Sequence, residues 1–324
     1  MTEGDPEMTT PERDPRRNAG PKDTPRIAIL GTGKMGSAIA ARLADSGFEL
    51  TLWNRTRARA EALGLGTVVD TPAAAVRDAD IVISNLTGPE AVRSTYLGPD
   101  GAISKGAGKL FIEMSTAGPD LLPSLAARIA GVDGRIVDAP ILGAPTVMRA
   151  GQAAILVGGP ALAVGMADPV LSALGTVRHV GPLGSGARLK LVANSMLADV
   201  VLAAAELQVA GERAGLQPDD VFWVLERMAP LLGARRNGIV EDRHEPTLFA
   251  LRDLRKDLDL AIALFEPSEI RTPMTSQARQ LVAAVASKYG DLDITAVERP
   301  YREGAPSPNG KARSAPPVAA APAR

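Results

Sequence analysis

The sequence predicts an α/β fold: a doubly wound, mostly parallel sheet, followed by an all-α domain that a long interdomain helix joins to it. Three observations predict this. The apolar run at residues 26–30 leads directly into the glycine-rich turn GTGKMG. Strand and helix patterns then alternate as far as residue 159, which is typical of a parallel sheet. From about Ala187 the strand signals stop and only helical patterns follow.

The first half is a series of short apolar runs separated by helical patterns. After the first strand and the glycine turn, SAIAARLADSG (37–47) has apolar residues at helical spacing and a glycine stop. FELTLWNRT (48–56) has the pattern of a second strand. Further strands are predicted at residues 66–70, 80–86, 109–116, 134–140 and 154–159, with helices between most of them, as at 72–79 and 121–131.

The second half contains helical patterns alone. Residues 189–215 form a long pattern that ends at a glycine, and residues 217–233 begin another with Pro218 and two aspartates in the first turn. Residues 251–265 and 272–290 complete the set. Small residues along the first of these helices suit close packing, within the chain or between subunits.

Both ends of the chain have the composition of disordered tails. Residues 1–24 are polar, mixed in charge and without the apolar core of a signal peptide. Residues 301–324 are rich in alanine and proline and show no periodicity. We therefore predict two domains, at 25–187 and 188–300. Because no apolar run is judged long enough to span a membrane, we expect a cytoplasmic protein with no membrane contact.

Composition argues against several classes of function. The chain has 324 residues, a net charge of −1, 3% aromatic residues and no cysteine. The absence of cysteine excludes disulfides, thiolate zinc sites and cysteine nucleophiles. His179 and His244 stand alone, so we interpret each as structural and expect no metal. The balanced charge and the scarcity of aromatic side chains argue against a nucleic-acid partner.

The glycine pattern between the first strand and the first helix predicts a dinucleotide site. Gly31 permits a tight turn, Gly33 lets the backbone approach a pyrophosphate, and Gly36 lets the helix pack closely on the strand. A flexible turn would need the same glycines, but the flanking elements fall where a Rossmann-type fold requires them. The predicted cofactor-binding turn comprises Gly31, Thr32, Gly33, Lys34, Met35 and Gly36.

The residues after the second strand predict which dinucleotide binds. An NAD site usually has an acidic residue here that accepts a hydrogen bond from the ribose 2′-hydroxyl. This chain has Asn54, Arg55 and Thr56 instead. Asn54 lacks the negative charge, and Arg55 can offer its guanidinium to a 2′-phosphate. A solvated loop of arginines is the alternative, but the pattern favours NADP (NADPH) over NAD.

Three further segments are expected around the same crevice. Ligands of a doubly wound sheet bind at the carboxyl ends of the strands. That rule brings together Leu86 with Thr87, Ser115 with Thr116, and the loop that follows residues 138–140.

These motifs together resemble the β-hydroxyacid dehydrogenase family, over about residues 26–298. The matching segments are LGTGKMG (30–36), WNRT (53–56), MSTAGP (114–119), DAPILGAP (138–145), GSGARLKLVAN (184–194) and RKDLDLA (255–261). GDLDITAV (290–297) is most similar to the glyoxylate/succinic semialdehyde reductase branch. The resemblance implies reversible hydride transfer between NADP and a short aldehyde or keto acid, or its hydroxy acid, in a homodimer or homotetramer.

The resemblance also implies the residues that move the proton. Lys190 and Asn194 match the family's catalytic pair, and their i, i+4 spacing puts them on one helical face. As an ammonium group, Lys190 would protonate the substrate carbonyl oxygen; as an amine it would act as base in the reverse reaction. Partial burial and nearby cations would lower its pKa towards working pH. A surface lysine lying along apolar groups is the alternative.

Further contacts follow from the same matching. Ser115 would touch the substrate carboxylate, and Thr116, with Leu86 and Thr87 nearby, the nicotinamide side of the cofactor. Lys256 would close the site over cofactor and substrate. For Lys256 the alternative is a solvated helix face with ion pairs, since RDLRKDLD is a charged cluster.

One segment departs from the family pattern. Leu142, Gly143 and Ala144 stand where the family usually has Ser-Gly-Gly. Leu142 removes a hydrogen-bond donor and adds apolar bulk, while the amide of Gly143 could still serve a carboxylate. We therefore expect a substrate that is less polar or larger than the family's simplest ones.

Two alternatives remain for the function. An imine reductase resembles the same fold and cofactor motifs, and Leu142 favours it modestly. A non-catalytic NADP-binding protein is the other. The retained pair Lys190 and Asn194 counts against both.

Overall fold

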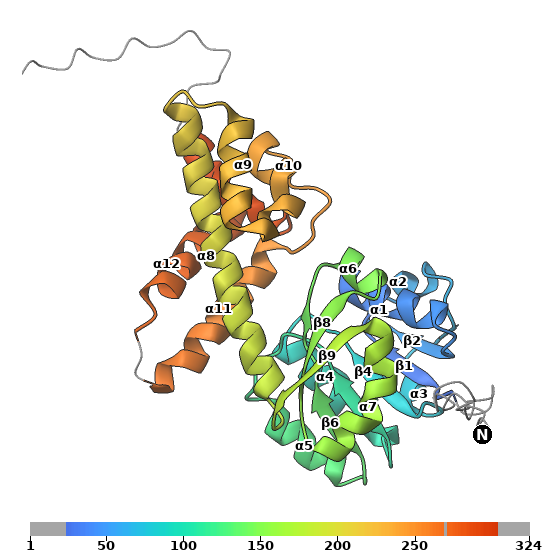
Figure 1. Ribbon diagram of the computed structural model, residues 1–324. Helices are drawn as coiled ribbons and strands as arrows, with labels where there is room; N and C mark the ends of the chain where they lie inside the picture. Colours follow the sequence, from blue (N-terminus) through green and yellow to red (C-terminus); the bar gives the residue numbers. More distant parts are fainter. Residues whose placement is uncertain (1–23, 269–270, 304–324) are drawn as a thin grey trace, which may run out of the picture. The chain divides into compact units, whose positions relative to one another are not determined.

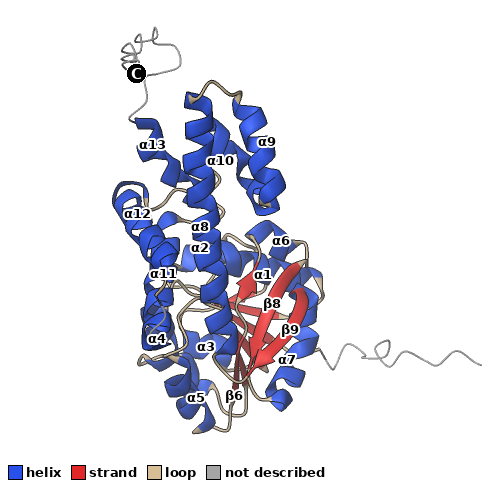
Figure 2. Ribbon diagram, turned by 60° about the vertical axis from the view of Figure 1, so that its left-hand side comes forward, coloured by secondary structure: helices blue, strands red, loops and turns tan. Residues whose placement is uncertain are grey.

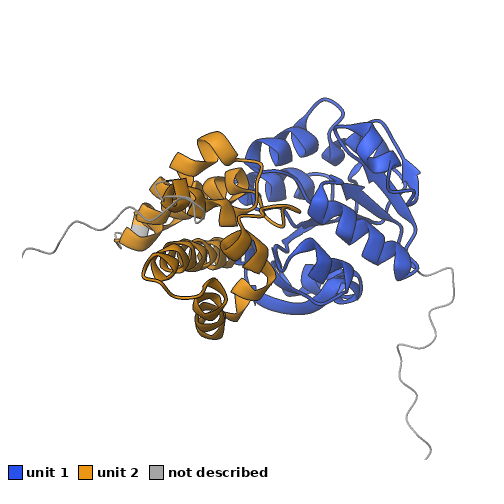
Figure 3. Cartoon of the chain, turned by 90° about the horizontal axis from the view of Figure 1, so that it is seen from above, with its two compact units in different colours: residues 1–186 blue, residues 187–324 orange. Residues whose placement is uncertain are grey.

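The computed structural model describes residues 24–268 and 271–303, and the chain divides into two compact units. The first unit ends at Gly186 and the second begins at Ala187 (Figure 3), one residue before the predicted boundary. Residues 1–23 and 304–324, which hold nearly all of both predicted tails, lie outside the described residues. Residues 301–303 of the predicted C-terminal tail belong to helix α13 (Arg299–Glu303).

One sheet forms the centre of the first unit (Figures 1 and 2). Its strands are β1 Ile27–Leu30, β2 Leu50–Trp53, β3 Thr67–Val68, β4 Ile81–Ser84, β5 Leu110–Glu113, β6 Arg135–Asp138, β7 Ile141–Leu142, β8 Ala153–Gly158 and β9 Gly175–Gly181. They lie in the order β3-β2-β1-β4-β5-β6-β8-β7, with β9 beside β8. The first six strands pair in parallel. This is the usual order of a dinucleotide-binding sheet, so the predicted fold is confirmed.

Helices cover both faces of this sheet. They are α1 Lys34–Asp45, α2 Arg57–Glu61, α3 Pro72–Val76, α4 Pro89–Leu97, α5 Leu122–Ala130, α6 Pro145–Arg149 and α7 Ala161–Leu174, with a 3₁₀ turn, η2, at Ala102–Lys105. Right-handed crossovers put α1 on one face and α3, α4 and α5 on the other. The central strands β1, β4 and β5 are therefore buried along their whole length. The strand order reverses between β1 and β4, which is where such a sheet binds its ligand.

Two strands were not predicted. β7 is two residues long and pairs antiparallel with β8. β9 lies at the edge of the sheet, and its residues are mostly exposed or half-buried. Its sequence GTVRHVG alternates polar and apolar residues and lacks the continuous apolar run of the buried strands. The His179 ring lies 3.0 Å from the carbonyl oxygens of Gly159 and Gly181.

The second unit is helical in its described part, as predicted. Its helices are α8 Ser185–Arg213, which begins at the end of the first unit, α9 Pro218–Met228, α10 Arg236–Glu241, α11 Leu251–Phe265, α12 Pro273–Tyr289 and α13, with 3₁₀ turns η3 Pro230–Arg235, η4 Glu266–Ser268 and η5 Ile294–Glu298. The helix predicted at 217–233 is wrong in its second part, because Pro230 starts η3 instead of continuing α9.

Helix α8 requires a correction to the sequence analysis. By length and composition it could cross a membrane, with a mean hydropathy of 1.4 in its most apolar window. The expectation that no apolar run reaches this length is therefore wrong. Val201, Ala204 and Ala205 of α8 belong to the apolar core of the second unit. A core helix passes the same test, so one such helix is weak evidence for a membrane span.

A buried aspartate holds the C-terminal segment of the second unit. Asp293, 4% exposed, accepts hydrogen bonds from the backbone amides of Leu248 and Phe249 at 3.0 Å each. It also accepts from the amide and hydroxyl of Thr295 at 3.2 Å. The GDLDITAV motif thus places its second aspartate where it joins two segments that are far apart in sequence.

Asp293→Ala is expected to lower the free energy of unfolding by about 2 to 4 kcal/mol, because several buried donors lose their only charged acceptor. Urea unfolding followed by circular dichroism measures this. Asp291→Ala is the matched control, since that side chain is 79% exposed and, within the described part of the chain, pairs with Arg252 alone; it is expected to change stability by less than about 0.5 kcal/mol. Equal losses in the two variants would contradict the assignment.

Candidate active site

The glycine turn leaves room for a ligand at the N-terminus of α1. Gly31 has φ +101°, and a Cβ atom there would overlap the carbonyl oxygen of Asn85; a Cβ at Gly36 would overlap the carbonyl oxygen of Gly31. A Cβ at Gly33 would meet no atom within 4 Å. The protein's own packing therefore requires Gly31 and Gly36 but not Gly33. Open space at the uncapped N-terminus of a twelve-residue helix fits the pyrophosphate of a dinucleotide.

Other residues of the turn differ in their surroundings. Thr32 is 3% exposed, and its hydroxyl finds no hydrogen-bond partner among the described residues, so it can serve a ligand. Lys34 is exposed at the first position of α1. Met35 is half-buried and packs against the core of the first unit.

Asn54 joins the end of β2 to the glycine turn. Its Oδ1 accepts the amide N–H of Thr32 at 3.0 Å, and its Nδ2 donates to the carbonyl of Thr56 at 2.9 Å. An aspartate could make the first bond but not the second, because it has no donor. Asn54 therefore suits this turn in a way that the acidic residue of many NAD sites would not.

The structure separates the arginines that follow β2. Arg57 is held by Glu61 at 2.8 Å and by Asp70 at 2.6 Å. Arg55 and Arg59 are exposed, and their side chains make no hydrogen bond or ion pair with any residue that the structure describes. Of the two, Arg55 directly follows Asn54, so it is the better candidate for a phosphate contact.

The loops after β4 and β5 are bound to each other. Asn85 Nδ2 donates to the carbonyl of Met114 at 3.1 Å, and the amide of Leu86 donates to the Ser115 hydroxyl at 2.8 Å. Ser115 is buried, Thr116 is half-buried, and Thr87, in the loop after β4, is exposed. The four candidates Leu86, Thr87, Ser115 and Thr116 thus lie in two adjoining loops at the carboxyl end of the sheet, where the sequence analysis expected them.

The Leu142 segment forms the turn after a short strand. Leu142 is half-buried in β7 and pairs with Ala154 of β8. Gly143 has φ +148° and is exposed, and Ala144 is the N-cap residue of α6. An apolar side chain therefore stands where a serine hydroxyl would offer a hydrogen bond.

A second cluster lies within the helical unit. Lys190 and Asn194 are on α8, and Lys256 and Asp257 are on α11. Asp257 is 2% exposed and accepts hydrogen bonds from Asn194 Nδ2 and Lys256 Nζ, each at 2.5 Å. The helices α8 and α11 thus bring together three residues that the sequence analysis selected, with Asp257 between two of them.

Charges and burial set the proton affinities in this cluster. Burial lowers the pKa of Lys190 to about 8, the negative charge of Asp257 opposes this, and the positive charge of Lys256 adds to it. Burial raises the pKa of Asp257, and the Lys256 charge and hydrogen bond oppose that. The lowered lysine pKa expected from the sequence is confirmed. A lysine with this pKa can both release and accept a proton near neutral pH.

Asp257 was noted in the sequence only as a member of a charged cluster. The sequence does carry a signal for its burial. Leu254, Asp257, Leu258 and Ala261 follow the i, i+3, i+4, i+7 pattern of one helical face, and all four are buried in α11. A charged residue on an apolar helical face needs partners, and Asn194 and Lys256 are those partners.

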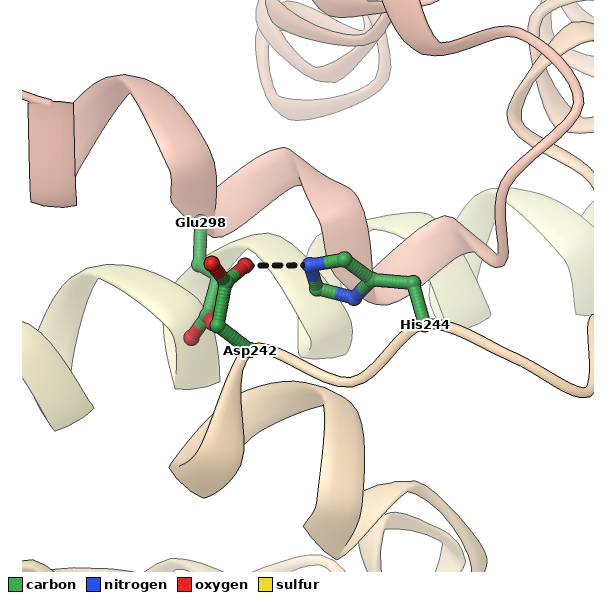
Figure 4. A group of neighbouring side chains, drawn as sticks. All are labelled: Asp242, His244 and Glu298. Atoms are coloured by element: carbon green, nitrogen blue, oxygen red, sulfur yellow. Dashed lines mark hydrogen bonds and ion pairs between the residues drawn. The ribbon is translucent and has the colours of Figure 1, made fainter.

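A third polar group combines Asp242, His244 and Glu298 (Figure 4), whose possible metal-ligand atoms lie within 4.8 Å of one another. The imidazole Nε2 of His244 is 2.7 Å from Asp242 Oδ1. Arg302 donates to Glu298 at 3.0 Å, and Arg299 lies 3.3 Å from Asp242. A metal ion would compete with both guanidinium groups for these oxygens. We therefore interpret the group as a hydrogen-bonded network that fixes the C-terminal segment.

Two known families match the chain in succession. Residues 26–181 match the family described as the NAD binding domain of 6-phosphogluconate dehydrogenase. Residues 184–301 match the family described as NAD-binding of NADP-dependent 3-hydroxyisobutyrate dehydrogenase. The two matches correspond closely to the two structural units.

Individual relatives agree. Glyoxylate/succinic semialdehyde reductase 1 of Arabidopsis thaliana is 29% identical over 283 residues, which cover 84% of this chain and 96% of that protein. The 3-hydroxyisobutyrate dehydrogenase of Pseudomonas aeruginosa is 30% identical over 293 residues, covering 85% and 98%. The solved structure of Mycobacterium tuberculosis 3-hydroxyisobutyrate dehydrogenase with L-serine is similar with a TM-score of 0.76 at 27% identity, covering 86% of this chain and 99% of that one.

Imine reductases share the fold as well. The structure from Pseudomonas sp. is similar with a TM-score of 0.58 at 20% identity, over 86% of this chain and 100% of that one. At this identity the likeness concerns the fold alone.

Proposed function

We propose that this chain, which belongs to the β-hydroxyacid dehydrogenase family, is an NADP-dependent reductase of a short aldehyde or keto acid and oxidises the matching hydroxy acid in reverse. The relatives include a semialdehyde reductase and a 3-hydroxyisobutyrate dehydrogenase, which act on CH–OH groups or their carbonyl counterparts. The observation that carries the proposal is Lys190, whose burial lowers its pKa to about 8 on the same helix as Asn194.

The residues of the helical unit would transfer the proton to and from the substrate oxygen. When bound, NADPH supplies the hydride that reaches the carbonyl carbon. Lys190, as an ammonium group, donates a hydrogen bond to the carbonyl oxygen and gives up its proton as that oxygen becomes an alkoxide. Asn194 gives one amide N–H to Asp257, which leaves its second N–H to hold the same oxygen. In the reverse direction the neutral amine of Lys190 removes the hydroxyl proton.

The residues of the first unit would hold the cofactor. The open space at Gly33, the unpartnered hydroxyl of Thr32 and the N-terminus of α1 fit a pyrophosphate. Arg55 would bind the 2′-phosphate that distinguishes NADP from NAD.

Arg55→Ala is expected to raise the dissociation constant of NADPH about 10- to 100-fold, since a charge-assisted hydrogen bond to a phosphate is lost. NADH has no 2′-phosphate, so its binding should not change. Fluorescence titration with both nucleotides measures the two constants. Arg57→Ala is the matched control, because Glu61 and Asp70 already hold that guanidinium; a larger loss in Arg57→Ala would contradict the choice of Arg55.

The substrate is proposed to be less polar or larger than glyoxylate, because Leu142 offers an apolar group where a serine would bind a carboxylate. The test is oxidation of NADPH and NADH with a panel of glyoxylate, succinic semialdehyde, methylmalonate semialdehyde, larger keto acids and cyclic imines. Turnover with NADPH of a larger carbonyl acid in preference to glyoxylate would support the proposal, and a preference for glyoxylate would contradict the role given to Leu142. Turnover of imines alone would replace it with imine reduction, and tight NADPH binding without any turnover would contradict the reductase.

A further inference from the structure

A buried carboxyl group lies at the carboxyl end of the sheet and takes no part in the proposed hydride and proton transfer. Glu113 is the last residue of β5 and is 2% exposed. Its register partner on β4, Ser84, is fully buried and donates its hydroxyl hydrogen to Glu113 Oε2 at 2.5 Å. Burial raises the pKa of Glu113, and hydrogen bonds from Ser115 and Ser84 oppose this. A buried acid of this kind is retained only where donors surround it.

The other oxygen of Glu113 fixes the loop that follows β5. Oε1 accepts the backbone N–H of Ser115 at 2.7 Å. The hydroxyl oxygen of Ser115 in turn accepts the N–H of Leu86, in the loop that follows β4. Ser84 lies at the base of that second loop. The two oxygens of one carboxyl group therefore hold the two loops: Oε1 binds the loop after β5, and Oε2 binds Ser84 at the start of the loop after β4.

The position of these loops assigns them to one half of the cofactor. A doubly wound sheet binds a dinucleotide across the point where the strand order reverses, with one half on each side. In this sheet that point lies between β1 and β4. Asn54 and Arg55 follow β2 and belong to the adenosine side, so the loops after β4 and β5 belong to the nicotinamide side.

We propose that Glu113 is a positioning residue for the nicotinamide half of the cofactor, because its buried carboxyl group ties the loops after β4 and β5 to each other. This inference rests on the proposed function. Glu113 acts through Ser115, Leu86 and Ser84 and does not itself touch the cofactor.

Tyr96 is a further member of the same network, since its hydroxyl also hydrogen-bonds to Glu113. Its hydroxyl is 2.6 Å from Ser84 Oγ, and its buried ring packs 5.7 Å from that of Phe111. Tyr96→Phe removes this hydroxyl, but Ser84 can still donate to Glu113. Glu113→Gln keeps the shape of the side chain and replaces one acceptor oxygen by an NH₂ group. The hydroxyls of Ser84 and Tyr96 can rotate to accept from it, so we expect the variant to fold.

The experiment is equilibrium binding of NADPH and of 2′,5′-ADP to the full chain. The second ligand carries only the adenosine half with its phosphate. Glu113→Ala removes the acceptor of the Ser115 N–H and is expected to weaken NADPH binding about tenfold, the effect of one well-placed hydrogen bond, and to leave 2′,5′-ADP binding unchanged. Glu113→Gln keeps an acceptor for that N–H and is expected to bind both ligands as the wild type does. Tyr96→Phe removes one donor to Glu113 and is expected to weaken NADPH binding less than Glu113→Ala does. Ser84→Ala, which also removes a donor to Glu113, is expected to give a selective loss and serves if Glu113→Ala does not fold.

Several results would overturn the inference. Equal weakening of both ligands would mean that Glu113 supports the whole unit and not one half of the site. Unchanged NADPH binding in Glu113→Ala, or a loss in Glu113→Gln as large as in Glu113→Ala, would also exclude the positioning role. A wild-type chain that binds neither ligand would overturn the proposed function along with this inference, whereas wild-type binding with unaffected variants would overturn this inference alone.

Discussion

Replacing Lys190 with alanine is expected to lower kcat for carbonyl reduction by about 100- to 10,000-fold, the usual contribution of a positioned general acid. Lys190 lies half-buried on α8, where burial lowers its pKa to about 8. Alanine cannot protonate the oxygen as the hydride reaches the carbon, so water alone remains for that step. NADPH binding should not change, because the proposed cofactor contacts of the glycine turn and Asn54 are in the first unit.

Steady-state kinetics with the best substrate of the panel, together with NADPH titration, measure this effect. Arg188→Ala is the matched control: it removes an exposed cation from the same helix, and its kcat should stay at the wild-type value. A Lys190→Ala enzyme with unchanged kcat would exclude Lys190 as the proton donor. Loss of NADPH binding in the same variant would indicate a structural role instead.

The role of Lys190 as proton donor also predicts how the reaction rate changes with pH. Reduction uses the protonated amine, so kcat/KM for reduction should be full below a pH of about 8 and fall above it. Oxidation uses the neutral amine, so its kcat/KM should rise through the same pH. Both dependences should be absent in Lys190→Ala, which lacks the amine that titrates.

Local patterns account for the parts of the fold and site that the sequence predicts. The apolar runs of β1, β4 and β5 are buried on both faces, so each is recognisable without its neighbours. Gly36 has its steric reason within the turn, at the carbonyl of Gly31, whereas that of Gly31 is the carbonyl of Asn85, directly after β4. β9 lies at an edge of the sheet and alternates polar with apolar residues. Its sequence therefore does not identify it as a strand, and only its pairing with β8 does.

The residues that the sequence did not single out depend on tertiary partners. Glu113 has its role from Ser84 and Ser115, which the folding of two neighbouring strands brings to it. The sequence singles out Arg55 by its place after Asn54, but only the positions of Glu61 and Asp70 show that Arg57 is already held. Asp257 belongs to the same class, since Asn194 comes to it from another helix.

Asp257→Asn is expected to lower kcat/KM for reduction about tenfold near pH 8, an effect of removing one close opposite charge. The negative charge of Asp257 raises the pKa of Lys190, whereas the positive charge of Lys256 lowers it. Asparagine removes the first influence and leaves the second. At a given pH less of Lys190 is then protonated, so the fall in reduction rate should begin at a lower pH than in the wild type.

The pH profile of the variant separates the charge of Asp257 from its hydrogen bonds. Asparagine keeps an oxygen that can accept from Asn194, so the geometry of that amide should survive. Below the shifted pKa, where Lys190 is fully protonated, the rate should therefore return towards the wild-type value. Asp259 lies on α11 like Asp257, is half-exposed and pairs with Arg279. Asp259→Asn should therefore leave the pH profile unchanged. A loss by the same factor at every pH would show that Asp257 acts by holding Asn194, and would exclude an effect of its charge on the pKa of Lys190.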